Sequence, residues 1–228
     1  MSQEEEKKIK KGASISSQKN EGTIKIVLIV LLLAGLLGVG LLFFSKQNRS
    51  EDNIAVSLNS SALPGIQSGD APWFAELIHL RERLMRIGLP ALQEEGSALH
   101  IHQHLSIFIH GKKYDVPPSI GFNPMERFIS PIHTHDGGGI IHIESPSVER
   151  FTLGAFFDVW GVRLDIKCLG SYCEDQKNAI KVFINGVRRE GDSRSIELAD
   201  HQVIVMTYGE NSEIPNPIPS QYAFPPGT

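Results

Sequence analysis

The chain has 228 residues, a formal net charge of −4 and 41% hydrophobic residues. At about 100–200 residues per domain, this length accommodates one domain with additional segments. A pI near 6.1 without a basic domain argues against nucleic-acid binding, and a content of two cysteines excludes a disulfide-dense miniprotein. The apolar residues are concentrated near the N-terminus, and seven of the nine histidines lie between His100 and His142.

The N-terminal region contains one long apolar segment. Residues 1–22 are rich in Ser, Lys and Glu, which predicts a disordered tail. After Lys25, the segment to Phe44 contains about 19 apolar residues, enough to span the roughly 30 Å of a bilayer core. A cleaved signal peptide would have a shorter apolar region, and no Ala-x-Ala-like cleavage site follows. We therefore predict an uncleaved transmembrane helix over residues 23–44, with the lipid bilayer as its partner.

The basic residues around this segment predict its orientation. Cytoplasmic flanks carry an excess of Lys and Arg, which places the N-terminal tail inside and everything after residue 45 outside or in the periplasm. Residues 45–70 are predicted to form a flexible stalk, and residues 71–228 a single extracytoplasmic domain. The lysines before or within the start of the segment are Lys7, Lys8, Lys10, Lys11, Lys19 and Lys25; only Lys46 and Arg49 follow it closely.

The domain holds both cysteines, Cys168 and Cys173. Outside the cytoplasm, such a pair is most simply a local disulfide that closes a small loop. A soft-metal or redox pair is the alternative.

The first elements predicted in the domain are a helix and a long strand. Apolar residues recur at helical spacing from Trp73 to Met85, and Gly88 and Pro90 end this amphipathic helix. From Leu99 the period changes to two, which predicts a strand up to Gly111 with one apolar face and one histidine face. The histidine face carries His100, His102, His104, Ser106, Phe108 and His110.

The later elements complete an α+β, β-rich fold with two short amphipathic helices. Residues 131–145 predict two short β segments around a glycine turn, and residues 153–160 a helix capped by Thr152 and ended by Gly161. Strands are predicted at residues 180–184 and 203–208, with a hairpin turn at Asn185-Gly186. The Pro-rich residues 215–226 predict an extended segment that wraps the domain.

Register arithmetic indicates that three histidines of the 131–145 hairpin converge. A two-residue turn at Gly137-Gly138, or a four-residue turn over 136–139, places His133 opposite His142, with Cβ atoms roughly 4.5–5.5 Å apart. His135 shares their face. This arrangement resembles the three-histidine geometry of carbonic anhydrase-type zinc centres, without implying a shared fold. A three-residue turn would place His142 on the other face.

The histidines of the long strand cannot all bind one ion with this set. Positions i and i+4 of a strand are roughly 13–14 Å apart, so without a bulge either two of these histidines join the hairpin set or a dinuclear site forms. Asp136 and Glu144 are candidate oxygen ligands, partners that orient a histidine, or general bases; Asp136, before three glycines, is equally a turn former. The predicted metal ligands are His100, His102, His104, His133, His135 and His142.

An imidazole set suits Zn, Cu, Ni or Fe, and Met or Cys ligands that favour Cu(I) are missing. We take Zn or Cu as the expected metal. A purely structural histidine face is the alternative. His79, His110 and His201 are interpreted as polar surface residues.

Several stretches of the domain are similar to a family of uncharacterised, membrane-anchored extracytoplasmic proteins of bacteria and archaea. The resemblance covers about residues 75–228. It implies that the two histidine motifs form one site and implies no particular activity. The matching stretches are Gly88-Leu-Pro-Ala-Leu with Glu95-Gly96, His100-Ile-His-Gln-His-Leu, Pro131-Ile-His-Thr-His-Asp, Gly139-Ile-Ile-His-Ile-Glu-Ser-Pro and Phe151-Thr-Leu-Gly-Ala-Phe-Phe-Asp-Val-Trp-Gly.

Three functions are therefore compared. The preferred one is a membrane-anchored extracytoplasmic protein that binds a transition metal. The first alternative is a metal-dependent hydrolase or hydratase with a three-histidine centre, in which Glu144 or Asp136 takes protons. The second alternative is a metal-free adhesion or assembly module that uses the Pro-rich end. The sequence indicates no particular protein partner.

Overall fold

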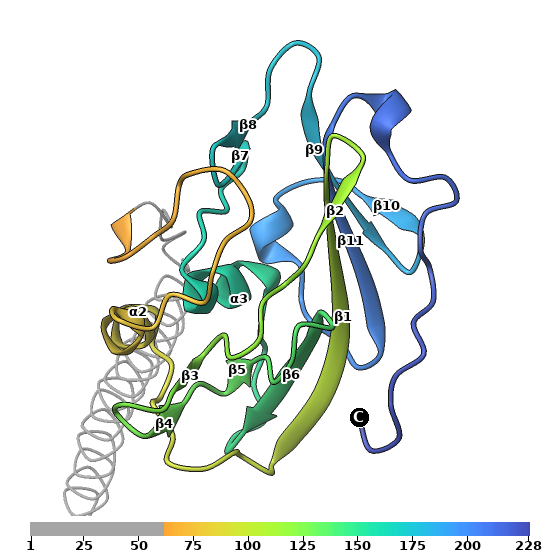
Figure 1. The fold of residues 1–228 in the computed structure, drawn as a ribbon. Coiled ribbons are helices and arrows are strands. Elements are labelled where there is room, and N and C mark those ends of the chain that lie inside the picture. The colour runs from red at the N-terminus through yellow and green to blue at the C-terminus, as the bar shows by residue number, and fades with distance from the viewer. Residues whose placement is uncertain (1–61) are drawn as a thin grey trace, which may run out of the picture. The chain divides into compact units, whose positions relative to one another are not determined.

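The computed structural model describes residues 62–228 (Figure 1). The predicted cytoplasmic tail, the transmembrane helix at 23–44 and most of the predicted stalk lie outside the described residues. Within the described part, neither α2 (Leu80–Ile87) nor α3 (Leu153–Trp160) is long and apolar enough to cross a membrane.

A seven-stranded mixed sheet organises the described domain, so the α+β, β-rich prediction is confirmed. Its strands follow the order β10-β9-β11-β1-β6-β5, and β2 pairs with β1. The central pair, β1 and β11, is parallel, and the other pairs are antiparallel. The strands are β1 (Leu99–Ile109), β2 (Lys112–Tyr114), β5 (Ile132–His133), β6 (Ile140–Ser145), β9 (Ala179–Ile184), β10 (Val187–Arg189) and β11 (Gln202–Gly209).

Smaller elements surround the sheet. Two short hairpins are formed by β3 (Phe122–Asn123) with β4 (Phe128–Ile129) and by β7 (Cys168–Leu169) with β8 (Tyr172–Cys173). Two 3-10 turns, η2 (Ser193–Ser195) and η3 (Asn211–Glu213), precede and follow β11.

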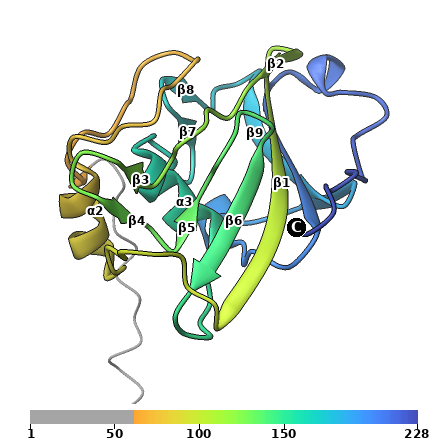
Figure 2. The same ribbon diagram turned by 60° about the horizontal axis from the view of Figure 1, so that its bottom comes forward.

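The two faces of the sheet have different roles. On β1, Leu105, Ile107 and Ile109 belong to the same hydrophobic core as residues of α3 such as Phe156 and Trp160. Both helices lie on this side of the sheet, and the C-terminal segment runs along the other side (Figures 1 and 2). The predicted strand is therefore confirmed, and its histidines lie on the face away from the helices.

Helix α3 begins and ends where the sequence predicts. The Thr152 hydroxyl accepts a hydrogen bond from the Ala155 N–H at 3.2 Å, and Gly161 ends the helix with φ 80°. The prediction of an amphipathic helix is wrong for this element, because seven of its eight residues are buried. The helix fills the centre of the core.

The first predicted helix is shorter than its apolar spacing suggests. Residues 73–79 are irregular, and α2 begins only at Leu80. The carboxylate of Glu76 accepts hydrogen bonds from the N–H groups of Ile78 and His79 and from the buried Arg83 guanidinium, which holds the chain in a turn before the helix.

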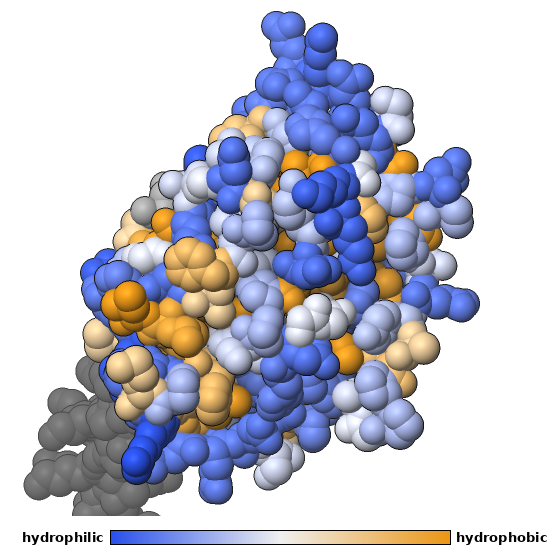
Figure 3. All heavy atoms as spheres, in the orientation of Figure 1, coloured by the Kyte–Doolittle hydropathy of each residue, from blue (hydrophilic) through white to orange (hydrophobic). Residues whose placement is uncertain are grey.

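The expected apolar face of this helix is only partly buried. Trp73 is buried, whereas Phe74, Ile78 and Met85 are 68%, 85% and 73% exposed. Figure 3 shows apolar side chains at the surface in the region of α2. The buried side of α2 instead carries Arg83 with Leu80 and Leu84.

The packed part of the chain begins before residue 71, earlier than the predicted end of the stalk. Leu63 is buried. The Gln67 N–H donates to the Gly161 carbonyl at 2.8 Å, and the Gln67 carbonyl accepts from the Arg163 N–H at 3.0 Å. Residues 62–70 thus pack against the domain, because their backbone groups pair with the segment that follows α3.

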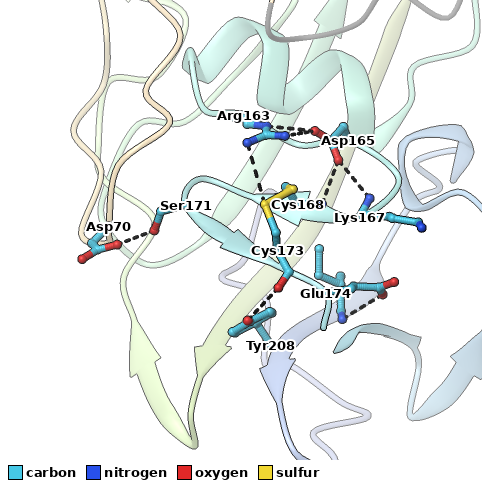
Figure 4. Close-up of a disulfide and its surroundings, with 10 residues drawn as sticks. Asp70, Arg163, Asp165, Lys167, Cys168, Ser171, Cys173, Glu174 and Tyr208 are labelled. Carbon is cyan, nitrogen blue, oxygen red and sulfur yellow. Dashed lines mark hydrogen bonds and ion pairs between the residues drawn. A yellow bond between two sulfur atoms is a disulfide. The ribbon is translucent and has the colours of Figure 1, made fainter. Parts of the chain in front are cut away.

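The predicted local disulfide is confirmed. Cys168 and Cys173 face each other in the β7–β8 hairpin and are bonded (Figure 4). Tyr208 of β11 donates its hydroxyl proton to the Cys173 carbonyl at 2.8 Å, and Asp165 accepts from the Cys168 N–H at 2.8 Å. The hairpin is thereby attached both to the sheet and to the segment after α3.

The remaining local predictions also hold. Asn185 and Gly186 connect β9 to β10 with φ values of 51° and 81°, as a two-residue hairpin turn of type I′ requires. Residues 215–226 form neither helix nor strand. They pack against the histidine side of the sheet, where the Tyr222 ring stacks on His104 with ring centroids 3.8 Å apart.

Candidate metal centre

Strand register brings five of the six predicted ligands together. His133 of β5 lies opposite His142 of β6, as the hairpin arithmetic predicts. On its other edge, β6 pairs with β1, so that His102 lies opposite His142 and His100 opposite Glu144. On the face away from α3, the three adjacent strands therefore carry two rows of polar side chains. One row contains His133, His142 and His102, and the other contains Glu144 and His100.

Four residues form the first group. One ligand atom each from His133, His135, His142 and Glu144 lies within 4.8 Å of all the others. The Nε2 atoms of His133 and His135 are 3.2 Å apart. Two nitrogens bound to one tetrahedral zinc at 2.0–2.1 Å are separated by about 3.4 Å. The spacing in this group therefore fits a shared ion.

His133 is held in the orientation that a ligand needs. Its side chain is 0% exposed, and its Nδ1–H donates to the Ser130 carbonyl at 2.9 Å. This hydrogen bond fixes the tautomer and leaves the Nε2 lone pair free toward His135. Burial, followed by the nearby His135, lowers the pKa of His133 to about 3, so the imidazole is neutral at pH 7.

His142 has a buried Nδ1 atom without a hydrogen-bond partner. Such an atom costs free energy unless something satisfies it. Burial, then the charges of His135 and His102, lowers the pKa of His142 to about 4, so this imidazole is also neutral at pH 7. Glu144 Oε1 lies 3.5 Å from this nitrogen, and a neutral imidazole is the form that binds a metal ion.

Glu144 contacts histidines of all three strands. Its carboxylate oxygens are 3.3 Å from His100 Nε2, 3.5 Å from His142 Nδ1 and 3.9 Å from His133 Nε2. Burial raises the pKa of Glu144 to about 7, and the neighbouring carboxyl of Glu95 adds to this shift. A cation at this position would favour the ionised carboxylate and displace its proton.

A second group consists of His100, His102 and the same Glu144, again with ligand atoms within 4.8 Å of one another. The rings of His100 and His102 lie 4.8 Å apart, centroid to centroid. His102 is buried, and this burial lowers its pKa. The side chain of His100 is 52% exposed, so this group opens to solvent.

The sixth predicted ligand lies apart from both groups. His104 donates from Nε2 to the Gly138 carbonyl at 3.2 Å and is stacked under Tyr222. Burial, then the Lys113 charge, lowers its pKa to about 4. The position of His104 follows from register: its partner is Ile140, the first residue of β6, where the hairpin turn ends.

Asp136 acts as the turn former that the sequence left open. Its side chain is exposed and accepts a hydrogen bond from the Gly138 N–H at 2.8 Å. His79, His110 and His201 lie outside the cluster, as predicted, and contact Glu76, Glu213 and the Thr228 carbonyl.

Sequence reasoning did not identify Glu95 as part of the site. Its Oε1 is 3.6 Å from His135 Nε2. Glu95 reaches this position because the next residue, Gly96, crosses the end of β6: a Cβ at Gly96 would lie 2.1 Å from the Ser145 carbonyl carbon. The Glu95-Gly96 pair ahead of the histidine strand is the signal that could have revealed it.

A cleft of about 460 Å³ opens beside Glu95. Its lining is mixed, with acidic, basic and aromatic side chains, and includes Glu94, Glu95, Phe122, Arg127 and Phe128. Glu95 lines this cleft and also contacts the half-exposed His135 of the histidine cluster.

Comparisons with protein-family models, curated proteins and solved structures find no match to this chain.

Proposed function

We propose that this protein binds a transition metal ion, zinc or copper, through the histidine cluster of its sheet. The observation that carries the proposal is the first group: four ligand atoms of His133, His135, His142 and Glu144 within 4.8 Å of one another. The unpartnered Nδ1 of His142 supports it.

The donor set suits the proposed metals. Imidazole nitrogens with one carboxylate oxygen are typical ligands of zinc and copper, whereas magnesium and calcium prefer oxygen alone. The buried imidazoles are neutral at pH 7, so the metal does not have to displace protons from them. In the metal-free protein, the Nε2–H of His135 can donate a hydrogen bond to His133 Nε2, 3.2 Å away, and the ion would replace this hydrogen bond.

The proposed location is the outer side of the cytoplasmic membrane. The apolar residues 23–44 serve as a single-pass anchor with the N-terminus inside. The disulfide supports this assignment, because disulfides persist mainly in oxidising compartments. A reporter enzyme that is active only outside the cytoplasm, fused after Thr228, should be active; activity of a reporter that works only in the cytoplasm would contradict the proposal.

Metal analysis tests the binding proposal. Purified full-length protein, stripped with a chelator and dialysed against Zn(II) or Cu(II), should retain the metal at pH 7. The variant His133→Ala/His135→Ala should lose most of it, because two of four ligands are removed. His79→Ala/His110→Ala removes two histidines away from the cluster and is the matched control. A wild-type protein with less than about 0.2 ion per chain would refute metal binding.

Catalysis by a hydrolase or hydratase is the second candidate. The cleft beside Glu95 favours it, since a substrate could approach the half-exposed His135 from there. A pKa of about 7 also suits Glu144 for proton transfer. Binding remains preferred because the first group already offers four protein ligands, and closed sites are typical of non-catalytic metals. Ester hydrolysis or CO2 hydration that is equal in zinc-loaded wild type and His133→Ala/His135→Ala would exclude this candidate.

A further inference from the structure

We infer that the cluster is a dinuclear centre in which the Glu144 carboxylate bridges two metal ions. This inference rests on the proposed function and extends it. The first ion would be bound by His133, His135 and His142, and the second by His100 and His102.

The ligand atoms form two groups instead of one. His133, His135, His142 and Glu144 lie within 4.8 Å of one another, and His100 and His102 form a separate group with the same Glu144. The ligands of a single tetrahedral ion are about 3.4 Å apart. One ion therefore accounts for the first group and leaves His100 and His102 without a role.

Glu144 is placed to join the two groups. Its Oε1 is 3.3 Å from His100 Nε2, while its Oε2 is 3.9 Å from His133 Nε2. Oε1 also lies 3.5 Å from His142 Nδ1 of the first group, so the carboxylate contacts histidines of both groups. His142 lies between the groups, with its ring 4.7 Å from that of His102 and 5.5 Å from that of His133, centroid to centroid.

The sheet itself supplies the spacing. Apart from His135, which follows β5, the ligands of the two groups lie on the neighbouring strands β1, β6 and β5, and adjacent strands are about 4.8 Å apart. Metal ions in two-metal sites are typically about 3.5–4 Å apart. A carboxylate on the middle strand can therefore reach both ions without any change of register.

Two adjacent cations need negative charge nearby. Glu144 supplies one carboxylate, and Glu95 supplies a second, 3.6 Å from His135. On the other side, Asp200 accepts a hydrogen bond from the backbone N–H of His102 at 3.1 Å, which holds a third carboxylate near the second group. These groups offset the repulsion between the ions.

The two ions would not be equivalent. The first group offers four protein ligands and includes the fully buried His133. The second offers three, and the His100 side chain is 52% exposed. Fewer protein ligands and contact with solvent leave coordination positions open. The second ion is therefore the weaker-binding one and the one that exchanges with solvent or binds an external ligand.

Stoichiometry distinguishes one ion from two. Chelator-stripped, full-length protein dialysed against excess Zn(II) should retain about two ions per chain. His100→Ala/His102→Ala should retain one, and so should Glu144→Gln, because an amide does not bridge as a carboxylate does. His79→Ala/His110→Ala, the matched control, should retain two. His100→Ala alone should lower the occupancy of the second ion. This variant changes only a half-exposed side chain, so the test remains valid if the double variant does not fold.

Copper provides an independent measurement of the bridge. Two Cu(II) ions joined by a carboxylate couple magnetically, so the integrated EPR signal per copper should be lower in wild type than in His100→Ala/His102→Ala. If wild type binds one ion and His100→Ala/His102→Ala also binds one, the dinuclear centre is overturned and the proposed function stays intact. Two ions that survive in both His100→Ala/His102→Ala and Glu144→Gln would also overturn it. No ion in wild type would overturn both proposals.

Discussion

Acidification of the metal-free protein should lower its free energy of unfolding steeply below pH 6.5. Three buried histidines with strongly lowered pKa values cause most of this effect, and the lowered pKa of the buried His102 acts in the same direction. Burial is the main reason that the pKa is about 3 for His133 and about 4 for His104 and His142, against an ordinary value of 6.5. Between these values the unfolded chain binds a proton at each histidine and the folded chain does not. The contribution of these histidines to stability is therefore complete above pH 6.5 and is lost as the pH decreases.

Glu144 acts in the opposite direction. Its pKa is raised to about 7 from 4.5, so between these values the folded chain keeps a proton that the unfolded chain releases. Near pH 5.5 the unfolded state thus binds two more protons than the folded state, from three histidines less one carboxyl. Each proton corresponds to about 1.4 kcal/mol per pH unit, which gives a slope of up to about 3 kcal/mol per pH unit. Domains of ordinary stability, about 5–15 kcal/mol, lose a large part of it over two such units.

Urea unfolding of the full-length protein in the presence of a chelator measures this slope. The buried Trp73 and Trp160 report on the core by fluorescence. We expect stability to fall with each step from pH 7 to pH 5, and His133→Leu to reduce the slope by about 1.4 kcal/mol per pH unit because one of the titrating groups is removed. The surface variant His110→Ala should leave it unchanged. A flat or inverted pH profile, or equal slopes for wild type and His133→Leu, would refute the reasoning.

Three further predictions concern the scaffold. Arg83→Met should destabilise the protein by about 3–5 kcal/mol in urea unfolding, because Arg83 is fully buried and its loss removes the cation that faces the buried Glu76 carboxylate. Gly96→Ala should both destabilise the domain and weaken zinc binding in a competition assay, since the new Cβ would meet the Ser145 backbone and displace the neighbouring carboxylate. Cys168→Ser/Cys173→Ser should lower stability by about 2 kcal/mol, the value expected for so short a loop.

Matched variants make these predictions specific. Arg86→Met removes an arginine whose ion pair is at the surface, and it should cost less than about 1 kcal/mol. Gly69→Ala places a Cβ in open space and should have little effect. A loss of stability in either control as large as in Arg83→Met or Gly96→Ala would contradict the structural explanation. Equal stability of the oxidised wild type and Cys168→Ser/Cys173→Ser would contradict the expected contribution of the disulfide.

The sequence by itself determined the elements whose signals are local. Alternation of side chains identified the long strand β1, and capping at Thr152 with a glycine at 161 identified α3. The glycine turn predicted the pairing of His133 with His142. These features depend on periodicity, caps and turn chemistry within about ten residues, which a sequence carries directly.

Only the tertiary structure decided which strands are neighbours. Nothing in the sequence places β6 beside β1, yet this pairing brings His100 and His102 to Glu144 and leaves His104 apart. The interpretation of residues 73–79 as helix failed for a related reason, since Glu76 forms its contact with the buried Arg83 only in the packed domain. Strand order and buried ion pairs depend on contacts between distant residues, so local periodicity could indicate the candidate ligands but not which of them share a group.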